Sequence, residues 1–245
     1  MANAQIPELI PALPELFLAM IIMSLLMFGV FQNGGRDEKS QTTFRYVTLM
    51  GVVSLLLTIL LTMMLAEQRL VTFGGMFLSD QYAVFCKTLV LLASAGSLAI
   101  AKGFMERQDL ARFEFPILTL FATLGMLMMI SANDMISLYL GLEIQSLSLY
   151  IIAAFQRDDT RSTEAGLKYF VLGAVASGML LYGMSLVYGF TGTTSFTVMA
   201  EIFTKTGPEG PGTGMIFGIV FIIAGLAFKV SAVPFHMWTP DVYEG

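Results

Sequence analysis

Apolar runs long enough to cross a lipid bilayer recur along this sequence and limit what it can fold into. A helix rises about 1.5 Å per residue, so roughly 20 apolar residues span a hydrocarbon core of about 30 Å. Composition agrees, because 56% of the 245 residues are hydrophobic and only 13% are charged. Soluble domains are charged at about a quarter of their positions. We therefore predict an all-α, multi-pass membrane protein whose first partner is the bilayer.

Seven helices are predicted between charged residues and Gly or Pro punctuation. They cover residues 14–31, 45–65, 80–101, 116–132, 134–155, 164–190 and 214–233. Asn133 is the candidate N-cap of the fifth helix, since its side chain can accept a hydrogen bond from a first-turn N–H group. We divide the chain into 1–115, which holds the first three helices, and 116–245, which holds the other four.

Basic residues between the helices gather on one predicted side of the membrane. Eight lie in the loops after the first, third and fifth helices: Arg36, Lys39, Arg45, Lys102, Arg107, Arg112, Arg157 and Arg161. The opposite loops hold Arg69 and Lys205. The positive-inside rule therefore places the N-terminus outside the cytoplasm.

Two segments on the predicted outer side have patterns of their own. Apolar triplets flank Gly74 and Gly75, which is the spacing of a hairpin with a two-residue loop. In 196–205, apolar residues recur at helical spacing, which favours a short helix in the membrane interface. An irregular loop is the alternative for that second segment.

The three other lysines, Lys87, Lys168 and Lys229, fall inside predicted helices, as does Glu143. An ionisable side chain at the bilayer centre costs about 2.5 to 3.5 kcal/mol on insertion scales. Such residues persist mainly where they face a bundle interior or a water-filled path. Their presence therefore predicts that several helices enclose a polar interior.

Glu143 and Lys229 are the strongest candidates for proton transfer. Pro234, five residues after Lys229, predicts that the seventh helix kinks or ends there, and transporters place ion sites at such breaks. Burial favours a neutral lysine and a nearby carboxylate favours a charged one, so Lys229 could exchange a proton. A fixed ion pair between Glu143 and Lys229, which would only hold helices together, is the alternative.

Three further residues have weaker signals. Lys168 lies about one turn inside the sixth helix, where it can relay protons or extend to the headgroups. Lys87 follows Asp80 by two turns, and we expect a structural role for it. His236, the only histidine, can carry protons near neutral pH or hydrogen-bond loop carbonyls.

The sequence lacks the motifs that bind nucleotides, flavins, iron–sulfur clusters or metals. It contains no Walker loop, GxGxxG, CxxC or His/Cys cluster, and Cys86 is its only cysteine. We expect no catalytic, cofactor-binding or metal-binding residue in this chain. The net charge of −5 gives no indication of nucleic-acid binding, and we expect no nucleic-acid partner.

Three motifs resemble a known family. They are GLEIQSLSLY at 141–150, EAGLKYF at 164–170 and GLAFKVSAVPFHMWTPDVYEG at 225–245. These resemble the subunit N family of bacterial respiratory complex I, the proton-translocating NADH:quinone oxidoreductase, whose mitochondrial counterpart is subunit 2. The family belongs to the antiporter-like membrane subunits, and its fold has fourteen helices containing two inverted repeats.

The resemblance implies a function and a location. Glu143 matches the family's fifth-helix glutamate, Lys229 the lysine of its broken seventh helix, and Lys168 a sixth-helix lysine. It implies a proton-translocating subunit in a bacterial inner membrane, with its N-terminus in the periplasm and other complex I membrane-arm subunits as partners. FMN, iron–sulfur clusters, NADH and quinone would be used elsewhere in the complex.

Other functions stay open at this point. A subunit of a multisubunit cation/proton antiporter or of a membrane-bound hydrogenase would share the motifs. A structural, non-conducting subunit would use the same charges to hold helices together. The polar stretch after Pro234 indicates a truncated chain that ends within the first repeat, so the lysines of a second half-channel are absent.

Overall fold

The computed structural model describes residues 9–32, 37–65, 69–205 and 212–244. Arg36 and the side chain of Lys39, both used above to assign the orientation, lie outside the described residues. The chain forms two compact units. Unit 1 comprises residues 1–132 and 140–149, and unit 2 comprises residues 133–139 and 150–245. The division at residue 115, which follows the expected repeat, stays a prediction.

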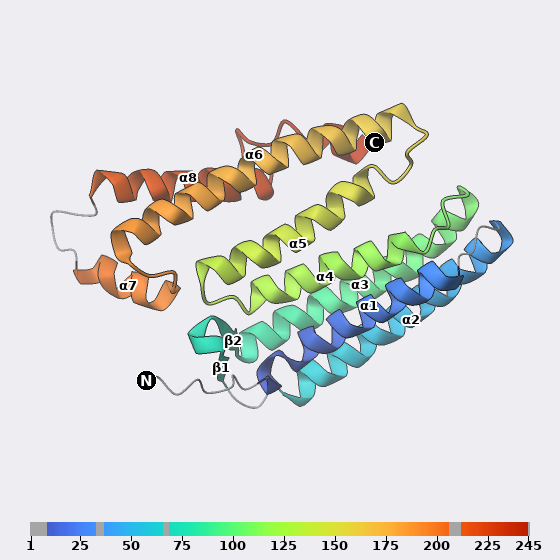
Figure 1. Ribbon diagram of the computed structural model, residues 1–245, viewed down its shortest axis with the longest axis horizontal. Coiled ribbons are helices and arrows are strands. Elements are labelled where there is room, and N and C mark those ends of the chain that lie inside the picture. Colours follow the sequence, from blue (N-terminus) through green and yellow to red (C-terminus); the bar gives the residue numbers. More distant parts are fainter. Residues whose placement is uncertain (1–8, 33–36, 66–68, 206–211, 245) are drawn as a thin grey trace. The chain divides into compact units, whose positions relative to one another are not determined.

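All seven predicted spans are helices, and the short helix at 196–205 is also present (Figure 1). The helices are α1 (Leu13–Gln32), α2 (Asp37–Met64), α3 (Gln81–Arg107), α4 (Glu114–Ile130), α5 (Met135–Ala153), α6 (Thr160–Thr191), α7 (Phe196–Lys205), α8 (Thr213–Lys229) and α9 (Thr239–Glu244). Among the described residues, five helices are long and apolar enough to cross a membrane, and α4 and α8 are shorter, at 17 residues each. The protein is therefore multi-pass.

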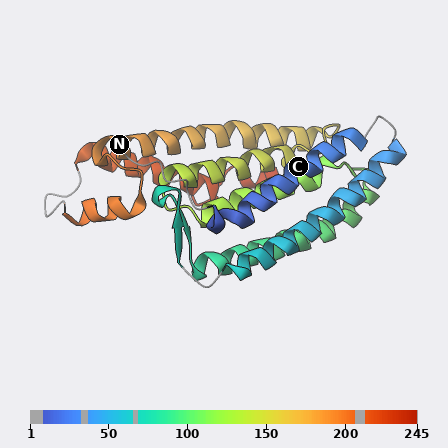
Figure 2. The same cartoon turned by 60° about the horizontal axis from the view of Figure 1, so that its bottom comes forward.

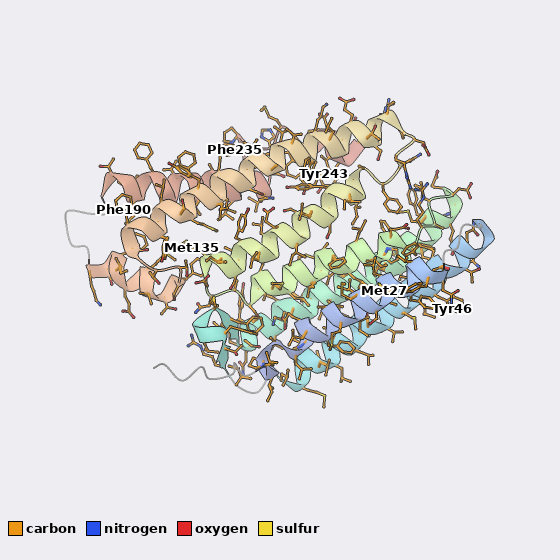
Figure 3. All side chains as sticks on the ribbon, in the orientation of Figure 1. Met27, Tyr46, Met135, Phe190, Phe235 and Tyr243 are labelled. Carbon is orange, nitrogen blue, oxygen red and sulfur yellow. The ribbon has the colours of Figure 1, made fainter. Side chains whose placement is uncertain are left out.

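Unit 1 is built on α1, α2, α3 and α4, which lie side by side (Figure 1). Their facing sides form one apolar core, whose fully enclosed members are Leu18, Ile22, Val47, Leu55, Leu91, Leu120 and Leu127, each 0% exposed. Met27 on α1 and Tyr46 on α2 are instead exposed (Figure 3). A helix bundle with an apolar core and an apolar outer surface suits a lipid environment.

The hairpin is present, but its loop is longer than predicted. Strands β1 (Leu70–Thr72) and β2 (Phe77–Ser79) pair antiparallel, so residues 73–76 connect them. Gly74 and Gly75 both have positive φ, at 64° and 95°. Phe73 also has a positive φ, 53°, so the turn starts one residue earlier than the two glycines suggest.

This hairpin closes one end of unit 1. The backbone N–H of Leu78 donates to the Ser131 carbonyl at 2.9 Å, just beyond the end of α4, and Phe77 forms a bridge with Ala132 (Figure 2). The hairpin therefore satisfies backbone groups that the end of a helix leaves open.

A buried ion pair joins two helices of unit 1. Lys87 on α3 is 1% exposed and its Nζ lies 2.5 Å from Glu15 Oε1 in the first turn of α1. The same Nζ lies 4.9 Å from the centre of the Phe77 ring, on the hairpin. Asp80, the nearest acidic residue in sequence, instead caps α3 by accepting from the Ala83 N–H at 2.8 Å. The partner of Lys87 therefore comes from another helix.

In unit 2, both ends of α5 are attached to the segment around α6. Asp134, and not Asn133, caps α5: its side chain accepts from the Ile136 N–H at 2.8 Å. Asn133 contributes its backbone carbonyl to the Phe196 N–H at the start of α7, at 3.3 Å. At the other end of α5, the Ser162 hydroxyl donates to the Ala153 carbonyl at 2.9 Å.

Helices α6 and α8 pack along one another in unit 2 (Figure 1). Glycines set their separation, since a Cβ added at Gly183 would lie 2.7 Å from the Gly218 carbonyl oxygen. At Gly178 on the same helix, an added Cβ would meet nothing within 4 Å. Gly178 lies on the exposed side of α6, two residues beyond the buried Ala176 that faces α8.

Replacing Lys87 with methionine should lower the unfolding free energy by about 3 to 5 kcal/mol, because it leaves Glu15 buried without its counter-charge. The double variant Lys87→Met/Glu15→Leu should recover most of that loss. Thermal unfolding of the detergent-solubilised protein measures both. Arg107→Met on the same helix removes an exposed charge and serves as the control; equal losses for both single variants would contradict the role of the pair.

Gly183→Ala should destabilise the protein by about 1 to 3 kcal/mol, because the methyl group forces α6 and α8 apart. Gly178→Ala adds the same methyl group on the same helix in open space, and should leave stability unchanged or slightly higher. The comparison is again made by thermal unfolding. A similar loss from both substitutions would show that helix separation does not depend on Gly183.

Candidate functional site

The predicted helix break lies at Lys229, the last residue of α8. Pro234 was expected to interrupt the helix, and the interruption begins earlier because Ser231 adopts a positive φ of 56°. The chain then runs through turns until α9 begins at Thr239. With 17 residues, α8 is only about 26 Å long. Lys229 therefore stands where regular helix gives way to irregular backbone.

Hydrogen bonds satisfy the carbonyl groups that the break exposes. The Phe228 carbonyl accepts from the Ser231 N–H at 3.1 Å and from the Trp238 indole Nε1–H at 3.2 Å. The Ala227 carbonyl accepts from the Ala232 N–H at 2.8 Å. Irregular backbone at membrane depth is tolerated only where protein or water supplies such partners.

Lys229 is half-buried, and its ammonium group donates a hydrogen bond to the Tyr150 hydroxyl at 3.0 Å. Tyr150 lies on α5 and is 5% exposed. Because the acceptor is a neutral phenol, it offers a hydrogen bond to the charged lysine without neutralising it. The pair joins the break in α8 to α5 within unit 2.

Lys168 occupies a charged cluster on α6 and α9. Its Nζ lies 2.7 Å from Glu164 Oε1 and 2.7 Å from Asp241 Oδ2, and its side chain is 42% exposed. These residues line a polar cavity of about 210 Å³ with Arg161 and Glu244. The lysine extends to exposed acidic side chains and ties α9 to α6.

The other two predicted residues, His236 and Glu143, belong to unit 2 and unit 1, respectively. His236 is exposed in the turn after the break, and its backbone carbonyl accepts from the Thr239 N–H at 3.1 Å. Glu143 is half-buried on the part of α5 that belongs to unit 1. There, α4 and α5 meet closely, since an added Cβ at Gly125 would lie 2.6 Å from the Gly141 carbonyl oxygen.

Burial separates the four predicted membrane charges. Only Lys87 is fully enclosed, whereas Lys229, Glu143 and Lys168 are all half-buried. The Lys168 side chain, 42% exposed, meets the acidic residues Glu164 and Asp241.

Sequence analysis missed Tyr150, Trp238 and Asp241 as partners of the charged residues. Tyr150 and Trp238 lie in two of the three motifs that carried the resemblance, but an aromatic residue in an apolar segment usually serves packing. Asp241 follows the break by a turn-rich segment whose path the sequence did not predict. Among the described residues, no group of three or more His, Cys, Asp or Glu side chains could hold a metal ion.

Comparison with known proteins identifies relatives of this chain. The family described as "NADH:quinone oxidoreductase/Mrp antiporter, TM" matches residues 132–245. NADH-quinone oxidoreductase subunit N of Paramagnetospirillum magneticum is 55% identical over 240 residues, which are 97% of this chain and 48% of that protein. The Parvibaculum lavamentivorans subunit N is 54% identical over 244 residues, which are 100% of this chain and 48% of that protein.

A solved structure shares the fold. A chain of respiratory complex I from Thermus thermophilus, determined with bound aureothin, superposes with a TM-score of 0.75 at 28% identity. The match covers 95% of this chain and 47% of that one. The present chain thus spans about half the length of the curated relatives it matches. Over the residues that it spans, the chain is similar to subunit N of NADH-quinone oxidoreductases.

Proposed function

We propose that this chain carries part of a proton path through the membrane arm of an NADH-quinone oxidoreductase. The observation that carries the proposal is the lysine at the break in α8, hydrogen-bonded to a buried tyrosine. Relatives named as subunit N of this enzyme support it. The chain contributes no redox chemistry: NADH oxidation, FMN, iron–sulfur clusters and quinone reduction belong to other subunits of the complex.

Each predicted residue has a role in this proposal. Lys229 takes up and releases a proton at the helix break, where turns give polar groups access to an otherwise apolar helix. Glu143, on α5, is its acidic counterpart. Lys168 and His236 are carriers nearer the membrane surface, where Lys168 meets Glu164 and Asp241.

The proposal includes the setting of the chain. The complex lies in a bacterial inner membrane, its other membrane-arm subunits are the partners, and the N-terminus faces the periplasm. The loops rich in arginine and lysine then face the cytoplasm, as the positive-inside rule requires. The reaction class of the whole complex is a proton-transporting oxidoreductase.

A cation/proton antiporter subunit is the second candidate, because the matching family description covers Mrp antiporters as well. The two functions differ in the complex that contains the chain. A purified parent complex with NADH dehydrogenase activity and bound flavin supports the first, whereas sodium-coupled proton exchange without flavin supports the second.

Lys229→Ala in the assembled complex should lower NADH-driven proton uptake by membrane vesicles at least about tenfold, since the proton loses its carrier at the break. Assembly, measured as complex per milligram of membrane protein, should stay unchanged. Lys205→Ala, an exposed lysine at the end of α7, is the matched control. Wild-type proton uptake in fully assembled Lys229→Ala complex would rule out this role.

Glu143→Gln separates proton transfer from structural support. The amide keeps the size and most hydrogen-bonding capacity of the carboxylate but cannot exchange a proton. We expect normal assembly with proton uptake reduced about tenfold or more. A complex that assembles poorly yet turns over normally per assembled unit would instead indicate that Glu143 only holds helices together.

A further inference from the structure

The hydroxyl of Tyr150 meets Lys229 in a position fixed from several sides. Lys229 Nζ lies 3.0 Å from the hydroxyl oxygen and 5.5 Å from the centre of the ring, so the ammonium group approaches the phenol at its oxygen end. At 5% exposure, Tyr150 has almost no access to solvent. Because the buried phenol oxygen accepts a hydrogen bond from the ammonium group, this contact fixes the direction in which the lysine side chain points.

Aromatic neighbours on α6 hold the Tyr150 ring. Tyr169 and Phe170 meet it edge-on, with ring centres 4.6 and 5.8 Å away. Edge-to-face geometry is the favourable arrangement for aromatic pairs. These contacts fix the plane of the ring, and therefore the direction in which its hydroxyl lies.

Gly173 on α6 leaves the space that the hydroxyl occupies. A Cβ added at Gly173 would overlap the Tyr150 hydroxyl oxygen and would lie 2.6 and 2.9 Å from the ring atoms Cζ and Cε1. Gly173 is buried, whereas Gly178, five residues further along α6, faces open space. Glycine at position 173 therefore leaves room for the hydroxyl end of Tyr150, including part of its ring.

The same aromatic group reaches the backbone next to Lys229. Tyr169 stacks on Trp238 with ring centres 4.6 Å apart, and Trp238 lies 5.4 Å from Phe228. Trp238 also donates to the Phe228 carbonyl. One continuous set of rings thus holds both Tyr150 and the residue that precedes Lys229.

We propose that Tyr150 is a positioning residue for Lys229. Its hydroxyl oxygen accepts a hydrogen bond from the ammonium group of Lys229. This hydrogen bond holds the ammonium group toward α5 at the helix break. The inference rests on the proposed function and adds a residue to it.

Tyr150→Phe tests the hydroxyl alone, because the ring and its edge contacts remain. Hydrogen bonds to charged groups shift equilibria by about tenfold or more, so we expect NADH-driven proton uptake per assembled complex to fall about tenfold. Assembly should match wild type. Tyr182→Phe, at an exposed tyrosine on α6, is the control and should retain full uptake.

Gly173→Ala provides an independent test, because it displaces the hydroxyl without removing it. It should lower uptake per assembled complex to about the level of Tyr150→Phe, whereas Gly178→Ala should not. Because the added Cβ would also lie 2.6 and 2.9 Å from the ring atoms Cζ and Cε1 of Tyr150, the amount of assembled complex is measured alongside uptake. A purely structural role predicts losses of uptake that follow the amount of assembled complex.

The outcomes separate this inference from the proposed function. Wild-type uptake in Tyr150→Phe, with strongly reduced uptake in Lys229→Ala, overturns the role of Tyr150 and leaves the function intact. Wild-type uptake in Lys229→Ala overturns the function itself, and the inference with it. Losses of uptake in Tyr150→Phe that only follow the amount of assembled complex also overturn the positioning role.

Discussion

The hydrocarbon core of a membrane offers a polypeptide no hydrogen-bonding partner. The backbone groups at the interruption of α8 must therefore find their partners within the protein. A helix that ends inside an apolar region leaves carbonyl groups that must find donors within the protein. Here the turn after Lys229 supplies two backbone donors, and Trp238 supplies a third from its indole. Because Trp238 also stacks on Tyr169, the backbone break is tied to α6. The position of Lys229 depends on this arrangement.

The position of Lys229 also depends on glycines along α6 and α8. Gly183 and Gly218 bring α6 and α8 close near their middle, and Gly225 meets Leu180 nearer the break. Gly173, further toward the start of α6, receives the Tyr150 hydroxyl instead. One helix thus sets both the distance to α8 and the space for the lysine's partner. Close backbone approach at small residues is the usual means of association between membrane helices.

Much of the fold could be predicted from sequence, because the length of an apolar segment and the position of a proline determine local structure. The seven helices, the short α7 and the break near Pro234 follow from patterns within each segment. Partners distant in sequence did not follow. Glu15 lies 72 positions before Lys87 and Asp241 lies 73 after Lys168, so pairing depends on packing that no single segment encodes. The Asp134 cap and the longer hairpin turn were missed because adjacent residues with similar propensities compete for them.

The enclosed pair of Lys87 and Glu15 has a consequence for an energised membrane. Moving one elementary charge across the full membrane potential is worth about 2.3 kcal/mol per 100 mV. An ion pair whose charged atoms lie 2.5 Å apart has no net charge, so the voltage exerts almost no net force on it. This connection between α1 and α3 is therefore electrically silent. The scaffold of unit 1 therefore holds equally well in charged and discharged membranes.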